Sequence, residues 1–379
     1  MKYKLGDICE IVSGSTPKTG IPEYWDGDKK WITPAEINEE SYIITDSARK
    51  LTELGVKKTG LSPFPEGTVI LSSRAPIGKV AIAGCEMYCN QGFKNLICSE
   101  KINNRYLYWF LKGNTEFLNS LGRGATFKEV SKQIVSNIEI NVPSIAQQEQ
   151  AAIQLETANA IIRFRKQQLQ KLDELVKARF VEMFGDFDLT RPQESWVAIK
   201  EIGTVVGGAT PKTNHDEYWG GSYPWITPAE LDADSGYIYD SIRKLTKAGV
   251  ESCSLQEMPV GTVILSSRAP IGKVAIAGNT FYCNQGFKNI ICKEGITPRY
   301  LYTVLLLNVE YLNSLGRGAT FKEISKGIVE SIRIPVPSME LQEQFAAFVE
   351  QTDKSKAAIQ KALDEAQLLF DSLMQKYFG

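Results

Sequence analysis

The stretch GTVILSSRAPIGKVAIAG at Gly67–Gly84 returns without a single change at Gly261–Gly278. The offset is 194 residues (261 against 67), and at the same offset Asn119–Glu129 returns unchanged as Asn313–Glu323. Repeats of 20–50 residues are typical of solenoids, whereas a repeat of this length has the size of a domain. The sequence therefore predicts two closely similar globular units within one polypeptide, which is a built-in dimer.

Outward from this stretch, the pattern predicts a mixed fold with short strands. Gly67–Ser72 is rich in β-branched residues and predicts a strand, with a turn at Ala75–Gly78 and a returning strand at Lys79–Gly84. Asn137–Pro143 alternates polar and apolar side chains, as a half-buried strand does, and Arg105–Asn119 predicts a helix. The expected fold class is α+β in both copies.

The character of the sequence changes after Pro143. Ser144 is a candidate N-cap, and neither Gly nor Pro occurs from Ile145 to Met183. Apolar residues recur every seven positions in this stretch and again near the end of the chain, which predicts two long helices with coiled-coil seams. The seam positions are Leu155, Ala158, Ile162, Leu169, Leu172, Val176 and Met183, then Val349, Ile359, Leu363, Ala366, Phe370, Leu373 and Tyr377.

These patterns divide the chain into five parts. We expect mixed α/β domains at 1–143 and 199–337, long helices at 144–184 and 338–379, and a linker at 185–198. Mutual packing of the two helices is favoured, because each would otherwise expose a large apolar face. Antiparallel pairing predicts a pseudo-two-fold symmetric molecule with the two domains separated by the helices. The alternative is that each helix lies as a separate amphipathic element on its own domain.

Composition narrows the class of function. The chain has 43 Lys and Arg against 44 Asp and Glu, a net charge of −1, which counts against a strongly basic, free-standing nucleic-acid binder. Any DNA-binding surface must be a local patch. The first residues lack a secretory apolar segment, and no apolar run reaches the length of a membrane helix, so a cytoplasmic protein is expected.

Catalytic and metal-binding patterns are missing from the sequence. The seven cysteines include no Cys-x-x-Cys pair, and the single histidine, His215, aligns with Ile21 in the other copy. A structural zinc site therefore has few ligands, and buried reduced thiols are the favoured interpretation. No phosphate-binding loop or glycine-rich nucleotide motif is present. Both copies are expected to be binding modules, with Glu36 and Glu230 as hydrogen-bonding anchors.

Several short runs, found in the same order in both copies, carry a resemblance to a known family. The first copy contains Gly14–Pro17, Trp31, Ser73–Gly78, Asn90–Phe93, Gly124–Phe127 and Gln148–Gln150; the second contains Gly208–Pro211, Arg268–Gly272, Asn284–Phe287, Gly318–Phe321 and Pro337–Gln344. Each run alone is weak, but together they resemble the specificity subunits of type I restriction–modification systems. The likeness extends over two target recognition domains and two helical spacers.

The resemblance implies a non-catalytic subunit that recognises a bipartite sequence in double-stranded DNA. Each recognition domain would bind one half of the target, while the helices set the spacing. Two methyltransferase subunits would dock on the chain, with two restriction or motor subunits as further partners. No cofactor is expected on the chain itself, because S-adenosylmethionine and ATP with Mg would belong to those partners. A duplicated scaffold for protein partners, without DNA specificity, is the alternative.

The two copies are unusually alike for such a subunit. They differ mainly in three patches, Asn38–Ala48, Glu53–Phe64 and Cys85–Met87, with their counterparts in the second copy. With antiparallel helices, two similar domains predict two similar half-sites in inverted orientation. The expected target is therefore interrupted and nearly palindromic.

Candidate DNA contacts are the basic and amide side chains that occur in both copies, because Arg and Lys read guanine and Asn and Gln read adenine. The first copy offers Thr16, Lys18, Arg74, Lys79, Asn90, Gln91, Lys94, Arg123 and Lys128. The second offers Thr210, Lys212, Arg268, Lys273, Asn284, Gln285, Lys288, Arg317 and Lys322. Each basic residue has the alternative of a solvated surface charge, and the amides that of stabilising a turn. Tyr24, Trp25 and Trp31 are interpreted as core aromatics.

Overall fold

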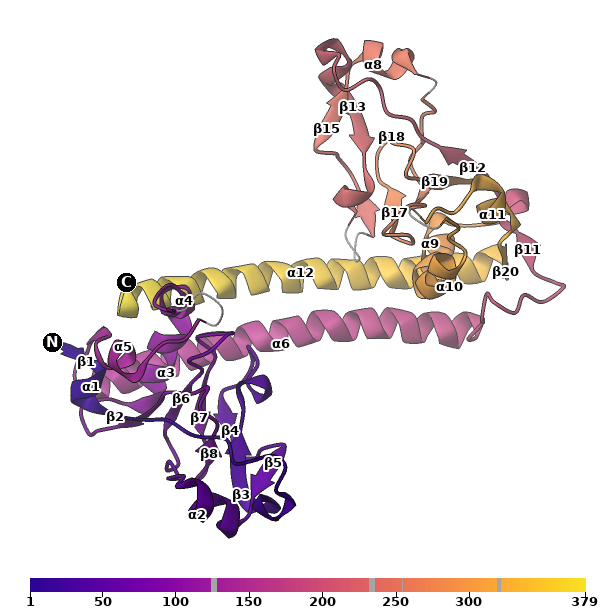
Figure 1. Ribbon diagram of the computed structural model, residues 1–379. Helices are drawn as coiled ribbons and strands as arrows, with labels where there is room; N and C mark the ends of the chain where they lie inside the picture. Colours follow the sequence, from indigo (N-terminus) through magenta and orange to yellow (C-terminus); the bar gives the residue numbers. More distant parts are fainter. Residues whose placement is uncertain (124–127, 232–235, 254, 319–321) are drawn as a thin grey trace. The chain divides into compact units, whose positions relative to one another are not determined.

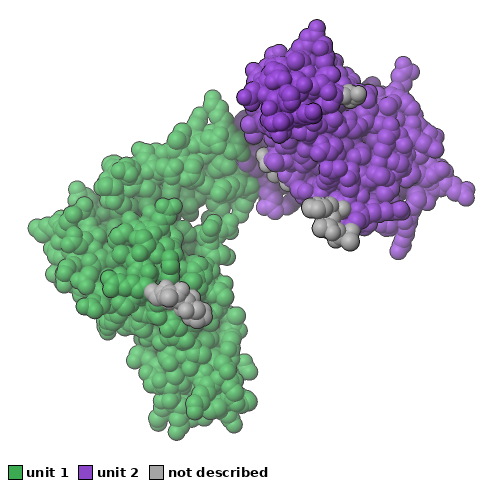
Figure 2. All heavy atoms as spheres, turned by 45° about the horizontal axis from the view of Figure 1, so that its top comes forward, with its two compact units in different colours: residues 1–167, 360–379 green, residues 168–359 purple. Residues whose placement is uncertain are grey.

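The computed structural model describes residues 1–123, 128–231, 236–253, 255–318 and 322–379. The chain forms two compact units, shown in Figure 2. Unit 1 contains residues 1–167 and 360–379, and unit 2 contains residues 168–359. Each unit thus combines one mixed domain with parts of both long helices. We call residues 1–143 globular region 1 and residues 199–337 globular region 2.

The elements follow the same order in the two regions (Figure 1). Region 1 contains β1 (Lys2–Lys4), α1 (Leu5–Ile8), β2 (Cys9–Val12), the 3-10 helix η1 (Pro22–Tyr24), β3 (Trp25–Ile32), η2 (Pro34–Glu36), β4 (Ile43–Ile44), β5 (Arg49–Leu51), α2 (Glu53–Thr59), β6 (Val69–Leu71), β7 (Val80–Ala83), β8 (Tyr88–Cys89), β9 (Asn95–Cys98), α3 (Asn104–Gly113), α4 (Thr115–Ser120), α5 (Lys132–Ser136) and β10 (Glu139–Asn141). Region 2 contains β11 (Val197–Ala198), α7 (Ile199–Ile202), β12 (Gly203–Gly207), η3 (Asp216–Tyr218), β13 (Trp219–Ile226), η4 (Pro228–Glu230), β14 (Tyr237–Ile238), β15 (Arg243–Leu245), α8 (Lys247–Ser252), β16 (Val263–Leu265), β17 (Val274–Ala277), β18 (Tyr282–Cys283), β19 (Lys288–Cys292), α9 (Pro298–Leu307), α10 (Val309–Ser314), α11 (Lys326–Ser331) and β20 (Arg333–Ile334).

Each region is built on a five-stranded and a three-stranded sheet. The strand orders in region 1 are β2-β9-β6-β7-β4 and β5-β3-β8, and region 2 repeats them as β12-β19-β16-β17-β14 and β15-β13-β18. A separate two-stranded sheet joins the start of each region to its end, β1 with β10 and β11 with β20. This α+β architecture with duplicated domains confirms the predicted fold class.

The stretch that identifies the repeat forms the central hairpin. Val69 lies opposite Ile82 and Leu71 opposite Val80 in the antiparallel β6–β7 pair, as the sequence predicts. Both strands are buried along their whole length, since α3 packs on this part of the sheet. The predicted helix at Arg105–Asn119 is divided into α3 and α4, because the chain leaves helical geometry at Asn114.

Two long helices follow the globular regions, α6 (Ile145–Phe184) and α12 (Met339–Phe378). The Ser144 hydroxyl accepts a hydrogen bond from the backbone N–H of Gln147, and the Gln147 side chain accepts one from the Ser144 N–H. This reciprocal pair is a capping box and confirms Ser144 as the N-cap. None of the described helices is long and apolar enough to cross a lipid bilayer.

The two helices contact each other in both units, in an antiparallel sense. In unit 1, Tyr377 near the end of α12 donates a hydrogen bond to Gln154 near the start of α6, at 2.6 Å. In unit 2, Phe180 near the end of α6 packs on Phe345 near the start of α12, with ring centroids 5.3 Å apart. The alternative of helices that each lie only on their own domain is therefore wrong.

The last turn of α6 packs against the core of unit 2, and the last turn of α12 packs against the core of unit 1. Phe184, at the end of α6, packs on Tyr300 of α9 with ring centroids 4.9 Å apart. The counterparts Phe378 and Tyr106 make the same contact in unit 1, also at 4.9 Å. Each region thus borrows a helix end that follows the other region in the sequence, as the subunits of a domain-swapped dimer do.

Candidate nucleic-acid interface

The repeated runs of sequence converge on one surface of each globular region. In region 1, the loop after β2 lies against the turn after β8, because the Ser15 N–H donates to the Cys89 carbonyl at 3.0 Å. The Thr16 hydroxyl also donates to Gln91 Oε1 at 2.6 Å. Region 2 repeats this contact between Thr210 and Gln285 at 2.7 Å.

A glycine makes this close approach possible. A Cβ atom at Gly14 would lie 1.7 Å from the Cys89 carbonyl oxygen, and one at Gly208 would lie 2.0 Å from that of Cys283. Both distances are far below van der Waals contact, so only glycine allows the loop to reach the turn. This close approach explains why a glycine begins each of the runs Gly14–Pro17 and Gly208–Pro211.

A carboxylate that the sequence reasoning overlooked organises the basic residues. In region 1, Glu129 accepts hydrogen bonds from Arg74 Nε at 3.0 Å and from Lys94 Nζ at 3.1 Å. Its backbone pairs with that of Arg123 through two 3.0 Å hydrogen bonds. Glu323 has the same partners in region 2, with Arg268 at 2.9 Å and Lys288 at 3.1 Å. The signal was present, since both carboxylates lie within the unchanged run that contains the repeated arginine.

The charge of these carboxylates is stabilised by their partners. Partial burial alone would raise the pKa of Glu129, but the hydrogen bonds and positive charges of Lys94 and Arg74 outweigh it and lower the pKa below its usual range. The pKa of Glu323 is lowered for the same reasons by Lys288 and Arg268. Both groups are therefore ionised at neutral pH and hold the arginines in place.

The predicted contact residues differ in how much they are exposed. The side chain of Arg74 is 46% exposed, whereas that of Lys94 is only 9% exposed and also donates to Ser73 Oγ. The counterparts Arg268 and Lys288 are 47% and 15% exposed. The arginines are thus available to a ligand, while the lysines neutralise the carboxylates from beneath the surface.

Two further predicted contacts are engaged in local structure. Lys79 Nζ donates to the backbone carbonyl of Pro34 at 3.0 Å, and Lys273 makes the equivalent bond to Pro228 at 3.1 Å. Asn90 Oδ1 accepts from the Gly92 N–H at 2.9 Å, which closes the turn before β9. Asn284 does the same in region 2 with the Gly286 N–H. These four side chains shape the surface through bonds within the protein.

The remaining candidates are exposed in both regions. We define the shared cluster as the repeated side chains that are accessible to solvent. In region 1 it contains Thr16, Lys18, Arg74, Gln91, Arg123 and Lys128, and in region 2 Thr210, Lys212, Arg268, Gln285, Arg317 and Lys322. The runs Gly124–Phe127 and Ala319–Phe321 lie outside the described residues. The shared cluster carries an excess of positive charge in both regions, although the whole chain is nearly neutral.

The aromatic residues support the loops from inside. Trp25 and Trp31 are buried and pack edge to face with ring centroids 5.1 Å apart, which confirms them as core aromatics. Trp31 Nε1 donates to the Ser15 carbonyl at 3.1 Å, and so holds the loop that carries Thr16. The Arg49 guanidinium stacks on Trp25 at 3.4 Å, a cation–π contact that Arg243 repeats on Trp219.

The glutamates at the ends of the two identical TPAE runs act as anchors. In η2, Glu36 accepts from the Thr33 N–H and the Ala48 N–H, both at 2.8 Å. Glu230 accepts from the Thr227 N–H at 2.9 Å and the Ile242 N–H at 2.8 Å. This confirms the hydrogen-bonding role predicted for the two glutamates.

The cysteines and the histidine do not form a metal site. All seven thiols are free, and burial is the main reason that the pKa values of Cys89 and Cys283 are raised to about 12. His215 is half-buried and lies beside Glu217 at 2.9 Å. Within the described ranges, no group of three or more His, Cys, Asp or Glu side chains is arranged to hold a metal ion.

Comparison with known proteins identifies the class to which this architecture belongs. The family model described as the type I restriction modification DNA specificity domain matches residues 1–174 and, a second time, residues 194–367. Because the two matches cover most of the chain, the chain belongs to this family. The predicted resemblance is thereby confirmed, and the family favours a specificity subunit over a general protein scaffold.

Two relatives from Methanocaldococcus jannaschii illustrate the likeness. The type I restriction enzyme MjaIX specificity subunit is 43% identical over 185 residues, which is 47% of this chain and 43% of that protein. The putative type I restriction enzyme MjaX specificity subunit is 25% identical over 398 residues, 95% of this chain and 89% of that protein. The first match thus spans less than half of the relative's length, while the second extends over nearly all of it.

Solved structures share the fold of the whole chain. The S subunit of a type I restriction–modification system from M. genitalium has a TM-score of 0.62 at 15% identity, covering 100% of this chain and 96% of that one. A chain from a study of the assembly and conformational transition of the type I system has a TM-score of 0.61 at 18% identity, covering 100% and 97%. At such low identity these likenesses establish the fold alone.

Proposed function

We propose that the chain is the DNA-recognition subunit of a type I restriction–modification enzyme, and that each globular region binds one half of a bipartite target. The observation that carries this proposal is the shared cluster, which presents the same exposed basic and amide side chains in both regions. A ligand with two similar parts suits a surface that occurs twice. Double-stranded DNA with two similar half-sites is such a ligand, and its phosphates attract local positive charge.

Within the shared cluster, the side chains are suited to different tasks. Arg74 is oriented by its Nε bond to Glu129 and is 46% exposed, which suits the bidentate contact by which arginine reads guanine. Gln91 is exposed and able to contact a base. Arg123 and Lys128 are exposed, which suits phosphate contacts.

The paired helices would set the spacing between the half-sites. A forty-residue helix is about 60 Å long at 1.5 Å per residue. Contacts between α6 and α12 in both units support a continuous antiparallel pair. Such a pair would hold two similar readers in inverted orientation, and the target that we propose is therefore an interrupted, nearly palindromic sequence.

The proposal assigns chemistry to partner subunits. Two methyltransferase subunits would dock on the helices, and two restriction or motor subunits would join them in a full system. The chain itself is proposed to be non-catalytic and to bind no cofactor, with S-adenosylmethionine, ATP and Mg held by the partners. We place the assembly in the cytoplasm, where it has access to the DNA of a prokaryotic cell.

Reconstitution tests the proposal. The chain is combined with the methyltransferase subunit from the same source, and retention of duplex DNA is measured as the salt concentration is raised. Sequence-specific retention that falls steeply with salt is expected, because binding releases counterions from the phosphates. Assembly with the methyltransferase, but with no specific DNA retention at any salt concentration, would support the scaffold instead.

A further inference from the structure

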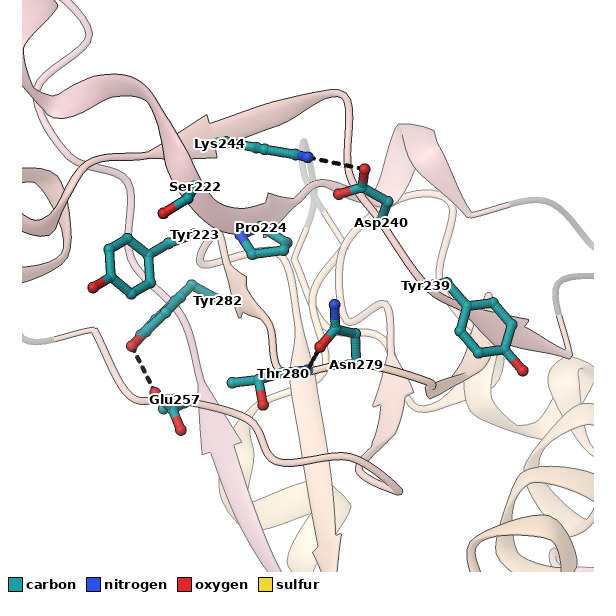
Figure 3. A pocket seen from close by; sticks show the side chains of 10 residues that line it. All are labelled: Ser222, Tyr223, Pro224, Tyr239, Asp240, Lys244, Glu257, Asn279, Thr280 and Tyr282. Carbon is teal, nitrogen blue, oxygen red and sulfur yellow. Dashed lines mark hydrogen bonds and ion pairs between the residues drawn. The ribbon is translucent and has the colours of Figure 1, made fainter.

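The two regions differ in the residues that line an open pocket. In region 2 this pocket has a volume of about 480 Å³ and lies among β13, β15 and the segments that follow β14 and β17 (Figure 3). We define the variable pocket by six lining residues that have changed between the copies: Ser222, Tyr223, Pro224, Tyr239, Asn279 and Thr280. A seventh changed lining residue, Glu257, stands where region 1 has Pro63. Three other lining residues, Asp240, Lys244 and Tyr282, are the same in both copies.

The matching positions in region 1 have a different chemistry. They are Asp28, Lys29, Lys30, Thr45, Cys85 and Glu86. They also lie together, because Lys30 Nζ donates to Cys85 Sγ at 3.2 Å and Cys85 Sγ donates to the Thr45 carbonyl at 3.3 Å. Four of the six are charged in region 1, whereas none of the six is charged in region 2. These six positions therefore offer cations and anions in region 1 and neutral hydroxyl, amide and aromatic groups in region 2. The charged side chains that line the region 2 pocket are Asp240, Lys244 and Glu257.

Region 2 presents defined groups in the variable pocket. Asn279 Oδ1 accepts from the Thr280 N–H at 2.8 Å, which orients the side-chain amide (Figure 3). The ring of Tyr223 packs edge to face on Tyr282, and Tyr282 donates to Glu257 at 2.9 Å. Tyr239 is 65% exposed. The pocket thus has a fixed wall of polar and aromatic side chains.

A single loop connects the variable pocket to the shared cluster. The Pro228 carbonyl accepts from Lys273, which lies in the arginine-bearing run. At the other end of the same 3-10 helix, Glu230 accepts from the Ile242 N–H, two residues beyond Asp240 of the pocket wall. A wall of the pocket is therefore linked through η4 to the run that contains Arg268, one of the proposed DNA contacts.

The difference between the copies indicates what the pocket contacts. Under the proposed function, two copies of the same methyltransferase subunit meet the two regions, and identical partners require the same side chains in both. The exposed side chains of the shared cluster, by contrast, are the same in both regions. Among the ligands of the complex, the two halves of the DNA target are the ones that can differ.

We infer that the variable pocket is a specificity-determining element, and that the two half-sites differ at the base pair or pairs that it contacts. This inference rests on the proposed function. Lys29 Nζ donates to Asp28 and Lys30 Nζ to Cys85, and each ammonium group has three donors. The remaining donors favour guanine, whose major-groove edge presents two acceptors, so we assign a G·C pair to region 1 there. The neutral hydroxyl and aromatic groups of region 2 favour an A·T pair, with apolar contact to the thymine methyl group.

An exchange of the six residues tests the inference. The first variant carries Asp28→Ser, Lys29→Tyr, Lys30→Pro, Thr45→Tyr, Cys85→Asn and Glu86→Thr, and the second carries the reverse changes in region 2. Proline is compatible with β3, since Pro224 occupies the matching position opposite Lys244 in β13. Each chain is produced with its methyltransferase, and methylated adenines are mapped across the host genome.

The wild-type chain is expected to modify a target whose halves agree except at the pocket position. The first variant should make both halves identical to the half read by region 2, and the second variant should make both identical to the other half. The control carries Lys57→Glu and Lys58→Ser, an exchange of exposed residues on α2 for those of α8, and should leave the target unchanged.

Three results would overturn the inference. They are wild-type halves that agree at every position, modification by the folded variants at the unchanged wild-type target, and loss of all modification in both folded variants. Circular dichroism of each purified complex establishes folding, and either exchange alone is sufficient for the test. A wild-type complex that binds no DNA specifically contradicts the proposed function itself, and so is distinguishable from a failure of the pocket assignment.

Discussion

Replacement of Arg74 by alanine probes the proposed recognition chemistry most selectively. Glu129 holds Arg74 Nε at 3.0 Å, and the side chain remains 46% exposed. A bidentate arginine–guanine contact contributes about 1–3 kcal/mol of discrimination against the wrong base, which corresponds to roughly 5- to 150-fold in affinity. Arg74→Ala should therefore weaken binding to the specific duplex by a factor in that range.

The loss is expected at one half-site only. Affinity is measured by fluorescence anisotropy, with the complex of the chain and its methyltransferase titrated into labelled duplexes. Four duplexes are compared: the mapped target, the target with either half scrambled, and a random sequence. With Arg74→Ala, scrambling the half-site read by region 1 should reduce the affinity by less than it does for wild type. Scrambling the other half-site should reduce the affinity as much as it does for wild type. Arg268→Ala should show the opposite pattern.

Lys128→Ala is the matched control, because Lys128 is exposed on the same surface and is assigned to a phosphate. It should weaken binding to all four duplexes alike, and lower the slope of log affinity against log salt by about one. The reasoning fails if Arg74→Ala weakens specific and random duplexes equally, or if it removes discrimination at both halves.

Three further predictions concern stability and spacing. Phe180 is 2% exposed and packs among the rings of Phe184, Tyr300 and Phe345. Phe180→Ala should therefore lower the free energy of unfolding of unit 2 by about 3–5 kcal/mol in urea denaturation, whereas Val181→Ala, at an exposed neighbour, should change it little. Equal effects of the two substitutions would contradict the packing. Because the pKa of Glu129 is lowered in the folded protein, its ion pairs stabilise the fold fully at a pH above the unfolded pKa of about 4.3. This stabilisation is lost as the pH falls through the folded pKa, so the difference in Tm between wild type and Glu129→Gln should shrink on acidification. A difference in Tm that stays constant would reject the ion-pair assignment. Insertion of seven residues at the middle of both α6 and α12 lengthens each helix by about 10.5 Å, and should widen the gap between the two half-sites by about 3 base pairs when modified adenines are mapped. A gap of unchanged length would exclude the helices as the spacing element.

Much of the fold follows from local pattern. The hairpin of β6 and β7 has β-branched residues on both sides of a turn, and the long helices have sustained apolar seams without Gly or Pro. The sequence could not show which core receives the ends of these helices. Phe184 packs on Tyr300 and Phe378 on Tyr106, and an apolar seam has the same appearance whichever domain it meets.

The sequence shows which candidate side chains the two copies share, but it does not show how those side chains are packed. Repetition between the copies pointed to the arginines, but exposure depends on packing that no repeat reveals. Lys94 and Arg74 occur in equally repeated runs, yet the first is buried against Glu129 and the second is exposed. The sequence also did not reveal that the helix is interrupted at Asn114, because the residues on both sides of Asn114 have the periodicity of a helix.

The central claim is that two similar regions each read one half of an interrupted DNA target. Its most direct test is to map methylated adenines at single-molecule level in a host that expresses the wild-type chain with its methyltransferase subunit. We predict one motif with two inverted halves that share most of their bases, separated by an unread gap of constant length. An uninterrupted motif, two halves in the same orientation, or two halves without common bases would contradict the account.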